Sequence, residues 1–239
     1  MKDREIDEAF SRVGRPLRGV DPAVLDRITA AIHSSLKPVR PLPGRRALIA
    51  ILVLMCTAVA LAGAARFGFF GFQALGLPER VVILSALATL AGLTASELVS
   101  HWTPGSRHHL TPQAVVALGT VTLLSVFGLL FHDYHAQHFV SAGVVCLCVG
   151  VLHAIPVSGL AAWLLRRGFA VDLISAGAIA GTLGGIGGVT MLELHCPNLE
   201  APHVLIWHGA VVPVSAAVAA LVGWSIQAWK SRSRLAPFT

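Results

Sequence analysis

Residues 170–208 read AVDLISAGAIAGTLGGIGGVTMLELHCPNLEAPHVLIWH, an apolar run followed by a short polar segment. The apolar part, 170–192, is long enough to cross the hydrocarbon core of a bilayer as a helix, since about 20 residues suffice. The polar segment extends from Glu193 to His208, and another apolar run starts within it at residue 203. This pattern predicts two transmembrane helices joined by a short loop.

The remainder of the chain has the same character. Of its 239 residues, 55% are hydrophobic and 13% are charged, and the mean hydropathy is +0.73, too apolar for a soluble domain. Runs of spanning length lie at 47–65, 81–100, 114–131, 139–165, 170–192 and 203–228. We therefore predict an all-α integral membrane protein with six transmembrane helices. The polar residues before the first run argue against a secretory signal peptide.

The basic residues predict the orientation of these helices, because Lys and Arg near span ends stay on the cytoplasmic side. With the N-terminus inside, sixteen of the eighteen Lys and Arg lie on inner segments, and only Arg66 and Arg80 lie on outer loops. Both termini are thus predicted to be cytoplasmic. The net charge of +6 then reflects topology, and we do not interpret it as a sign of nucleic-acid binding.

Three segments follow from this topology: a cytoplasmic tail (1–46), a six-helix membrane domain (47–229) and a basic C-terminus (230–239). In the tail, residues 3–13 can form a short helix, and Asp21 followed by Pro22 is a typical start of a second one. Apolar residues then recur at helical spacing, at Val24, Leu25, Ile28, Ile32 and Leu36. Such a short helix needs a surface, which could be the lipid bilayer, the rest of this protein or a soluble partner.

Cysteine and histidine gather on the predicted outer side. The polar segment carries Cys196 with His195, His203 and His208, and the outer turn after the third span carries His132, His135 and His138. Thiolate and imidazole suit soft or borderline divalent metal ions, although no CxxC or HExxH motif is present. We consider as possible metal ligands Cys146, Cys196, His195, His203, His132, His135 and His138. A plain interhelical loop with interfacial side chains is the alternative.

The fourth span holds two cysteines, Cys146 and Cys148, which lie about 200° apart around a helix. Cys146 shares a face with His153, seven residues later, which favours Cys146 as the functional thiol. A disulfide from Cys146 to Cys196 is a second possibility for the same residues, since the outer side of a bacterial inner membrane is oxidising. It would require the loop to dip about 12 Å into the bundle.

The fifth span is rich in glycine, with small residues four apart at Gly177, Gly181, Gly184, Gly185 and Gly188. This spacing is typical of helices that approach one another closely in membranes. We therefore expect the fifth span to pack tightly against its neighbours.

Two motifs in this layout resemble a known family. The tail ends in KPVRPLP (37–43), whose prolines indicate an extended spacer, and the last outer loop carries HCP (195–197) and APH (201–203) before Trp207-His208. With six spans, these features resemble the negative-regulator-of-sigma-F (NrsF) family of bacterial transmembrane anti-sigma factors. The resemblance implies a non-enzymatic inner-membrane protein whose tail binds an extracytoplasmic-function sigma factor, with Cys146 and Cys196 as the sensing pair.

Two other classes of function use the same residues. A metal-ion transporter or channel subunit would use His153 and Glu193 along its pathway, and it predicts ion flux. A membrane thiol oxidoreductase would cycle Cys146 and Cys196 with a quinone, and it predicts redox turnover, although no cofactor motif is present. The sequence carries no signal for an oligomeric state.

Overall fold

The computed structural model describes residues 21–35, 43–103, 106, 109–136, 138–165 and 172–235. The chain divides into two units, Met1–Leu42 and Pro43–Thr239, so the division falls within the proline-rich spacer. The first unit contains helix α2 (Pro22–Ser35). The second contains the helices α3 (Arg45–Phe67), α4 (Phe70–Ala74), α5 (Leu77–Trp102), α6 (Pro112–Leu130), α7 (Phe139–Leu165), α8 (Leu173–His195), α9 (Ala201–His203) and α10 (Gly209–Leu235).

The prediction of six spans is confirmed in the part of the chain that the structure describes. Six helices are long and apolar enough to cross a membrane: Arg45–Phe67, Leu77–Trp102, Pro112–Leu130, Phe139–Leu164, Leu173–His195 and Ala201–Arg232. The last one combines α9, a π-helical turn (Val204–His208) and α10. Pro202 lies in its first turn, where a missing N–H costs nothing, so this proline starts the sixth span.

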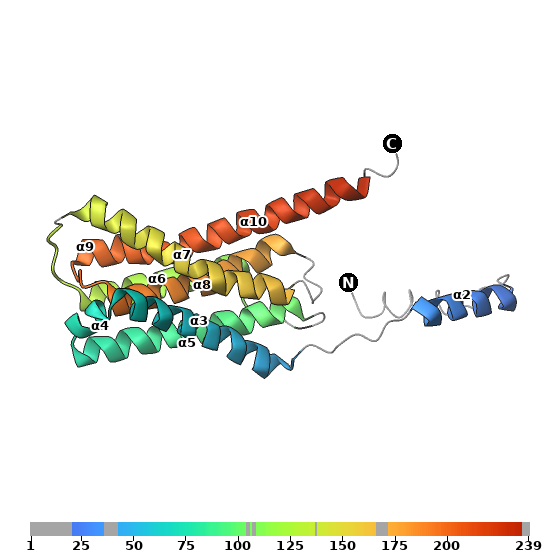
Figure 1. The fold of residues 1–239 in the computed structure, drawn as a ribbon, viewed down its shortest axis with the longest axis horizontal. Helices are drawn as coiled ribbons and strands as arrows, with labels where there is room; N and C mark the ends of the chain where they lie inside the picture. The colour runs from blue at the N-terminus through green and yellow to red at the C-terminus, as the bar shows by residue number, and fades with distance from the viewer. Residues whose placement is uncertain are drawn as a thin grey trace, which may run out of the picture. The chain divides into compact units, whose positions relative to one another are not determined.

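Helix α8 is the centre of the bundle. It packs against α3, α4, α5, α6, α7 and α10, and Figure 1 shows it running through the middle of them. Most of its residues are buried. The helix begins at Asp172, whose Oδ1 accepts hydrogen bonds from the backbone N–H groups of Ile174 and Ser175 at 3.0 and 3.2 Å.

Glycine makes this central position possible. A Cβ atom on Gly181 would lie 2.3 Å from the carbonyl oxygen of Ser215 in α10, and one on Gly188 would lie 2.2 Å from that of Gly150 in α7. The backbones of α8 and its two neighbours are therefore in direct contact. The tight packing that the small-residue spacing predicts is present on two faces of the helix.

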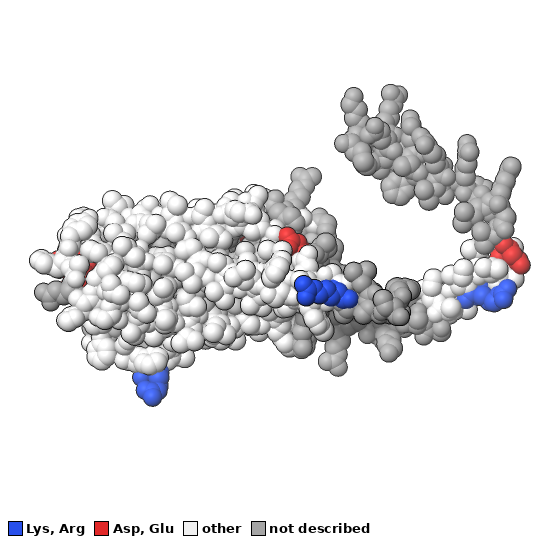
Figure 2. All heavy atoms as spheres, turned by 90° about the horizontal axis from the view of Figure 1, so that it is seen from above, with Lys and Arg blue, Asp and Glu red and all other residues white. Residues whose placement is uncertain are grey.

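The outer surface of the bundle is apolar. Large hydrophobic side chains are exposed on it, among them Leu54, Leu129 and Leu221, which are 67, 75 and 62% exposed. Figure 2 shows one face of the bundle almost without charged side chains. Such a surface is stable in lipid, where exposed apolar side chains carry no penalty.

Helix α2 of the first unit begins as the sequence predicts. Asp21 Oδ1 accepts a hydrogen bond from the backbone N–H of Ala23 at 2.9 Å, and Pro22 is the first helical residue. Its apolar side chains are exposed: Val24, Leu25, Ile28 and Ile32. The fifth predicted member of this stripe, Leu36, and the short helix predicted for residues 3–13 lie outside the described residues.

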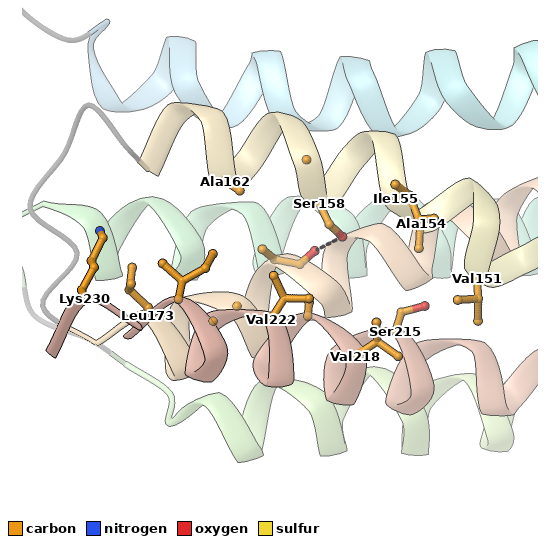
Figure 3. A pocket seen from close by; sticks show the side chains of 16 residues that line it. Val151, Ala154, Ile155, Ser158, Ala162, Leu173, Ser215, Val218, Val222 and Lys230 are labelled. Carbon is orange, nitrogen blue, oxygen red and sulfur yellow. Dashed lines mark hydrogen bonds between the residues drawn. The ribbon is translucent and has the colours of Figure 1, made fainter. Parts of the chain in front are cut away.

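A groove of about 430 Å³ lies between α7, α8 and α10. Its walls are mostly apolar, and Figure 3 shows Ala154, Val218 and Val222 among the side chains around it. Ser158 at its edge donates a hydrogen bond to the carbonyl oxygen of Ala180 at 3.2 Å. Residues of α7 and α10 line this groove, and the two helices contact each other at Gly150 and Val211.

A buried cysteine and histidine cluster

The C-terminal end of α8 carries the polar segment to one end of the bundle. This end holds α4 and α9, whereas α3 begins and α10 ends at the opposite one (Figure 1). The backbone N–H of Cys196 closes the last turn of α8 on the carbonyl oxygen of Leu192 at 2.7 Å. The backbone N–H of Ala201 donates a hydrogen bond to the backbone carbonyl oxygen of Asp133 at 2.6 Å, which connects this loop to the α6–α7 connection.

The sixth span starts with an irregularity. From Val204 to His208 the chain forms a π-helical turn, in which the backbone N–H of Gly209 bonds to the carbonyl oxygen of Val204, five residues earlier. Residues five apart are thereby stacked along the turn. His203 and His208 consequently lie side by side, with ring centroids 5.2 Å apart and an interplanar angle of 76°.

Two thiols meet these two imidazoles. The Sγ atoms of Cys146 and Cys196 are 3.7 Å apart, and Cys196 Sγ is also 3.7 Å from Nε2 of His203. One ligand atom from each of Cys146, Cys196, His203 and His208 lies within 4.8 Å of the other three. Cys196, His203 and His208 are buried, and Cys146 is partly exposed. Two thiols and two imidazoles at these separations can bind a metal ion or, at the thiols, lose electrons to an oxidant.

A carboxylate supports the cluster from within the bundle. The Nδ1–H group of His208 donates a hydrogen bond to Glu193 Oε1 at 2.7 Å, and both side chains are buried. This bond fixes the tautomer of His208, so that its Nε2 atom is the unprotonated one in the neutral ring. Glu193 is thereby satisfied inside an apolar bundle, where an unpaired carboxylate would be costly.

Other elements pack closely around the cluster at Gly71 of α4 and Gly143 of α7. A Cβ atom on Gly71 of α4 would lie 2.6 Å from the carbonyl oxygen of Cys196 and 2.7 Å from that of Glu193. On the other side, Trp207 lies directly over Gly143 of α7, where a Cβ would be 2.0 Å from its indole nitrogen. A Cβ at Gly71 would require a shift of the backbone at the end of α8, and one at Gly143 would require the Trp207 side chain to move.

The structure brings together three of the predicted site residues, Cys146, Cys196 and His203. His195, although adjacent to Cys196, is not a member of the cluster: its Nδ1–H donates to the carbonyl oxygen of Gly68 at 3.1 Å. The ring of His195 packs against Phe67 and Phe70. It helps to position the α3–α4 connection over the end of α8.

The three histidines of the other outer turn are exposed and lie outside the cluster: His132, His135 and His138. His135 contacts the carboxylate of Asp133, and this hydrogen bond raises the pKa of the His135 imidazole and lowers that of the Asp133 carboxyl. Their separation from the cluster follows from the start of α7 at Phe139, which carries Cys146 two turns below the turn residues.

The other cysteines stand apart. Cys148 is exposed on α7, as its angular distance from Cys146 predicts, and Cys56 is buried against α8. At Cys196 the neighbouring Cys146 thiol and burial both raise the pKa of the thiol. Of the two pathway residues considered above, His153 bonds to its own helix at Val149 O, and Glu193 bonds to His208.

His208 is a member of the cluster that the sequence did not single out. It counts among the outer histidines, but an α-helix places residues five apart about 140° from each other, which puts His203 and His208 on different faces. Only the π-helical turn brings them together, and no residue in Val204–His208 signals such a turn.

A family model matches most of the chain. The family model described as negative regulator of sigma F matches residues 33–229, which include the last turn of α2, the first five spans, most of the sixth and the whole cluster. No curated protein and no solved structure matches the chain.

Proposed function

The chain belongs to the negative-regulator-of-sigma-F family, and from this premise we propose that it is a membrane-bound anti-sigma factor that holds an extracytoplasmic-function sigma factor inactive. The family implies a sigma factor as the partner. The sigma-binding element that we propose is α2. The observation that carries this assignment is its row of exposed apolar side chains, Val24, Leu25, Ile28 and Ile32, each 38 to 53% exposed.

An amphipathic helix with such a row binds partners by laying the apolar face into a groove. The apolar residues of α2 recur at spacings of three and four, which places them on one side, while Ala23 and Ala30 lie on the opposite one. Most of α2 lies before residues 33–229, which the family model matches. The role that we propose for α2 therefore rests on its amphipathic pattern and on its position before the first span.

We place the tail in the cytoplasm, where sigma factors act, and the protein in the bacterial inner membrane. The distribution of Lys and Arg supports this orientation, since sixteen of the eighteen lie on the side of the termini. The Cys146, Cys196, His203 and His208 cluster then faces the outer side, where it is accessible to metal ions and oxidants.

The signal in this proposal is a change of chemical state at the cluster. Helix α8 carries Cys196 at its end and packs against α3, which follows directly after the tail. Gly187 of α8 lies against Cys56 of α3, where a Cβ would be 3.0 Å from the sulfur. A shift of α8 is therefore transmitted to α3. A ligand that converts a 1:99 equilibrium to 99:1 must favour one state by about 5.5 kcal/mol, less than the 10–16 kcal/mol of structural zinc sites.

Capture of the partner tests the proposal. The full chain, purified in detergent and immobilised, is incubated with cytosol of its host, and bound proteins are identified by mass spectrometry. We expect a sigma factor among them. The variant Leu25→Asp with Ile28→Asp should lose it, because two charges cannot enter an apolar groove.

The matched control is Ala23→Asp with Ala30→Asp, which adds the same charge to the same helix on the opposite side. It should retain the sigma factor. If both variants bind like the native chain, α2 is not the sigma-binding element. If no sigma factor is captured by the native chain, the anti-sigma assignment fails, and ion flux in vesicles becomes the relevant measurement.

A further inference from the structure

We infer that Cys146, Cys196, His203 and His208 form one four-coordinate site for a thiophilic divalent cation of the zinc and cadmium class, and that Glu193 is its positioning residue. The inference deepens the proposed function, because it names the chemistry of the signal. It stands on the geometry of the cluster, which does not depend on the identity of the cytoplasmic partner.

The separations fit a tetrahedral ion. With bonds of about 2.3 Å to sulfur and 2.0–2.1 Å to nitrogen, the ligand atoms of a tetrahedral zinc site lie about 3.3–3.8 Å apart. The Cys146–Cys196 sulfur pair and the pair of Cys196 Sγ and His203 Nε2 are both separated by 3.7 Å. These two separations, each an edge of the tetrahedron of ligand atoms, are already close to their length in a metal-bound site before any ion binds. The remaining donor, a ring nitrogen of His208, lies within 4.8 Å of the other three, so small side-chain rotations complete the tetrahedron.

His208 has a free nitrogen at the right place. Its Nδ1–H is bound to Glu193, and its buried Nε2 has no hydrogen-bond partner among the described residues. A buried nitrogen without a partner costs about 1–3 kcal/mol, which a bound cation would offset. A carboxylate on the second ring nitrogen is the usual support of a metal-binding histidine, because it fixes the tautomer and raises the basicity of the ligand atom.

The charges also fit a divalent ion. When two thiols bind M²⁺, they release two protons, and the two thiolates cancel the charge of the ion. The neutral complex can therefore remain in an apolar bundle, where an unbalanced charge is costly. Because two of the four donors are thiolates, soft and borderline ions are favoured over Mg²⁺ and Ca²⁺, which require oxygen ligands.

The route to the site lies along Cys146. Cys196, His203, His208 and Glu193 are at most 6% exposed, whereas Cys146 is partly exposed on α7. An ion that enters from the Cys146 side joins α7 to the loop after α8 and to the first turns of the sixth span.

Titration of the full chain with Co²⁺ tests this inference. The protein is purified in detergent, reduced and freed of metal with a chelator. Tetrahedral Co²⁺ bound to thiolates gives intense visible ligand-field bands and a near-ultraviolet charge-transfer band, and Zn²⁺ or Cd²⁺ should displace both. We expect one Co²⁺ per chain. Both signals should be lost in Cys146→Ser and in Cys196→Ser. In His208→Ala the charge-transfer band should keep its position, but Co²⁺ should bind with lower affinity.

Glu193→Gln tests the positioning role, because glutamine still accepts the hydrogen bond but carries no charge. We expect Co²⁺ affinity to fall about 10- to 100-fold with the same spectrum. Elution of each variant as a single species in size-exclusion chromatography shows that it is folded. Matched controls are Cys148→Ser and His195→Ala, neighbours in sequence that lie outside the cluster, and both should bind like the native chain.

Three results would overturn the inference: no cobalt spectrum in the native chain, a spectrum that survives both cysteine substitutions, or a spectrum lost when His132, His135 and His138 are replaced by alanine. None of these measurements involves the sigma factor. If the cobalt titration fails but the sigma factor is still captured, the metal site is rejected and the proposed function stands. If cobalt binds as expected but no sigma factor is captured, the sigma partner is rejected and the protein is a metal-binding membrane protein.

Discussion

Cys146 and Cys196 are fifty residues apart in the sequence, yet their Sγ atoms lie 3.7 Å from each other at the same end of the bundle. Since a disulfide bond is about 2.05 Å long, the pair is in van der Waals contact, and a small rotation of either side chain suffices to join it. The loop after α8 does reach down to α7, as a bridge to Cys146 requires. The same two thiols can therefore respond to an oxidant as well as to a metal ion.

We predict that a mild thiol oxidant such as diamide joins Cys146 to Cys196 in the metal-free protein. The two thiols lose two protons and two electrons to the oxidant, and one sulfur–sulfur bond forms. Differential alkylation followed by mass spectrometry should show both cysteines protected. Cys148 and Cys56 should remain alkylatable after denaturation, because one points away from the bundle and the other is buried against α8.

The control for this oxidation is Cys148→Ser, which should react like the native chain. A bridge from Cys148 to Cys196 would contradict the geometry. Addition of Zn²⁺ before the oxidant should slow the reaction, because a bound cation occupies the electron pairs that the sulfurs would use.

Replacement of Gly188 by alanine should destabilise the bundle. The added Cβ would lie 2.2 Å from the carbonyl oxygen of Gly150, and neither backbone can move without shifting a whole helix. Overpacking of this kind costs about 1–3 kcal/mol. Thermal unfolding of the detergent-solubilised protein should therefore begin at a lower temperature.

Gly92→Ala in α5 is the matched control, since its Cβ would meet nothing within 4 Å. Alanine is the better helix former by about 1 kcal/mol, so this variant should be as stable as the native chain or more stable. Equal losses in the two variants would show that backbone contact between α7 and α8 is not what holds the bundle together.

The fold followed from the sequence because each of its determinants is local. A run of about 20 apolar residues requires a helix in lipid, Asp21 can cap the turn that follows it, and glycines four apart permit close packing. These features need no knowledge of distant residues. The six spans and the start of α2 were predicted for this reason.

The site followed only in part, because it depends on geometry between elements. The angular argument correctly separated Cys146 from Cys148, since both lie on one regular helix. The angles of a regular α-helix could not have paired His203 with His208, because the π-helical turn alters the angle per residue between them. The angular argument also gave no means to relate the turn at His132 to the loop at Cys196, so that exposed histidines were included among the possible ligands.

Filling the groove between α7 and α10 should uncouple the cluster from the tail. Gly159 lies in its wall, and a Cβ there would meet no atom within 4 Å, so Gly159→Leu places a side chain in the free space. We expect Co²⁺ binding to be unchanged, since the groove is separate from the four ligands. Release of the captured sigma factor by metal or oxidant should decrease, because α7 and α10 can no longer close on each other.

Gly92→Leu adds the same side chain on α5, away from the groove, and should release the sigma factor normally. Both variants are compared in the capture assay, with the amount of sigma factor eluted by Cd²⁺ or diamide as the readout. Normal release from Gly159→Leu would show that movement into this groove plays no part in the response.

Deletion of Ile206 should preserve the cluster, because a π-helical turn contains one residue more than the α-helical turn it replaces. Without Ile206, which is 53% exposed, His203 and His208 become four residues apart and still share a face. We expect native Co²⁺ affinity and thermal stability. The control is deletion of Val218, which is also apolar and is 48% exposed. This deletion turns the rest of α10 by about 100°. It therefore moves Ala219 away from Gly177 and Gly181, which it contacts in the native chain. That variant should unfold at a lower temperature. Loss of cobalt binding on deletion of Ile206 would show that a spacing of four residues does not bring the two imidazoles together.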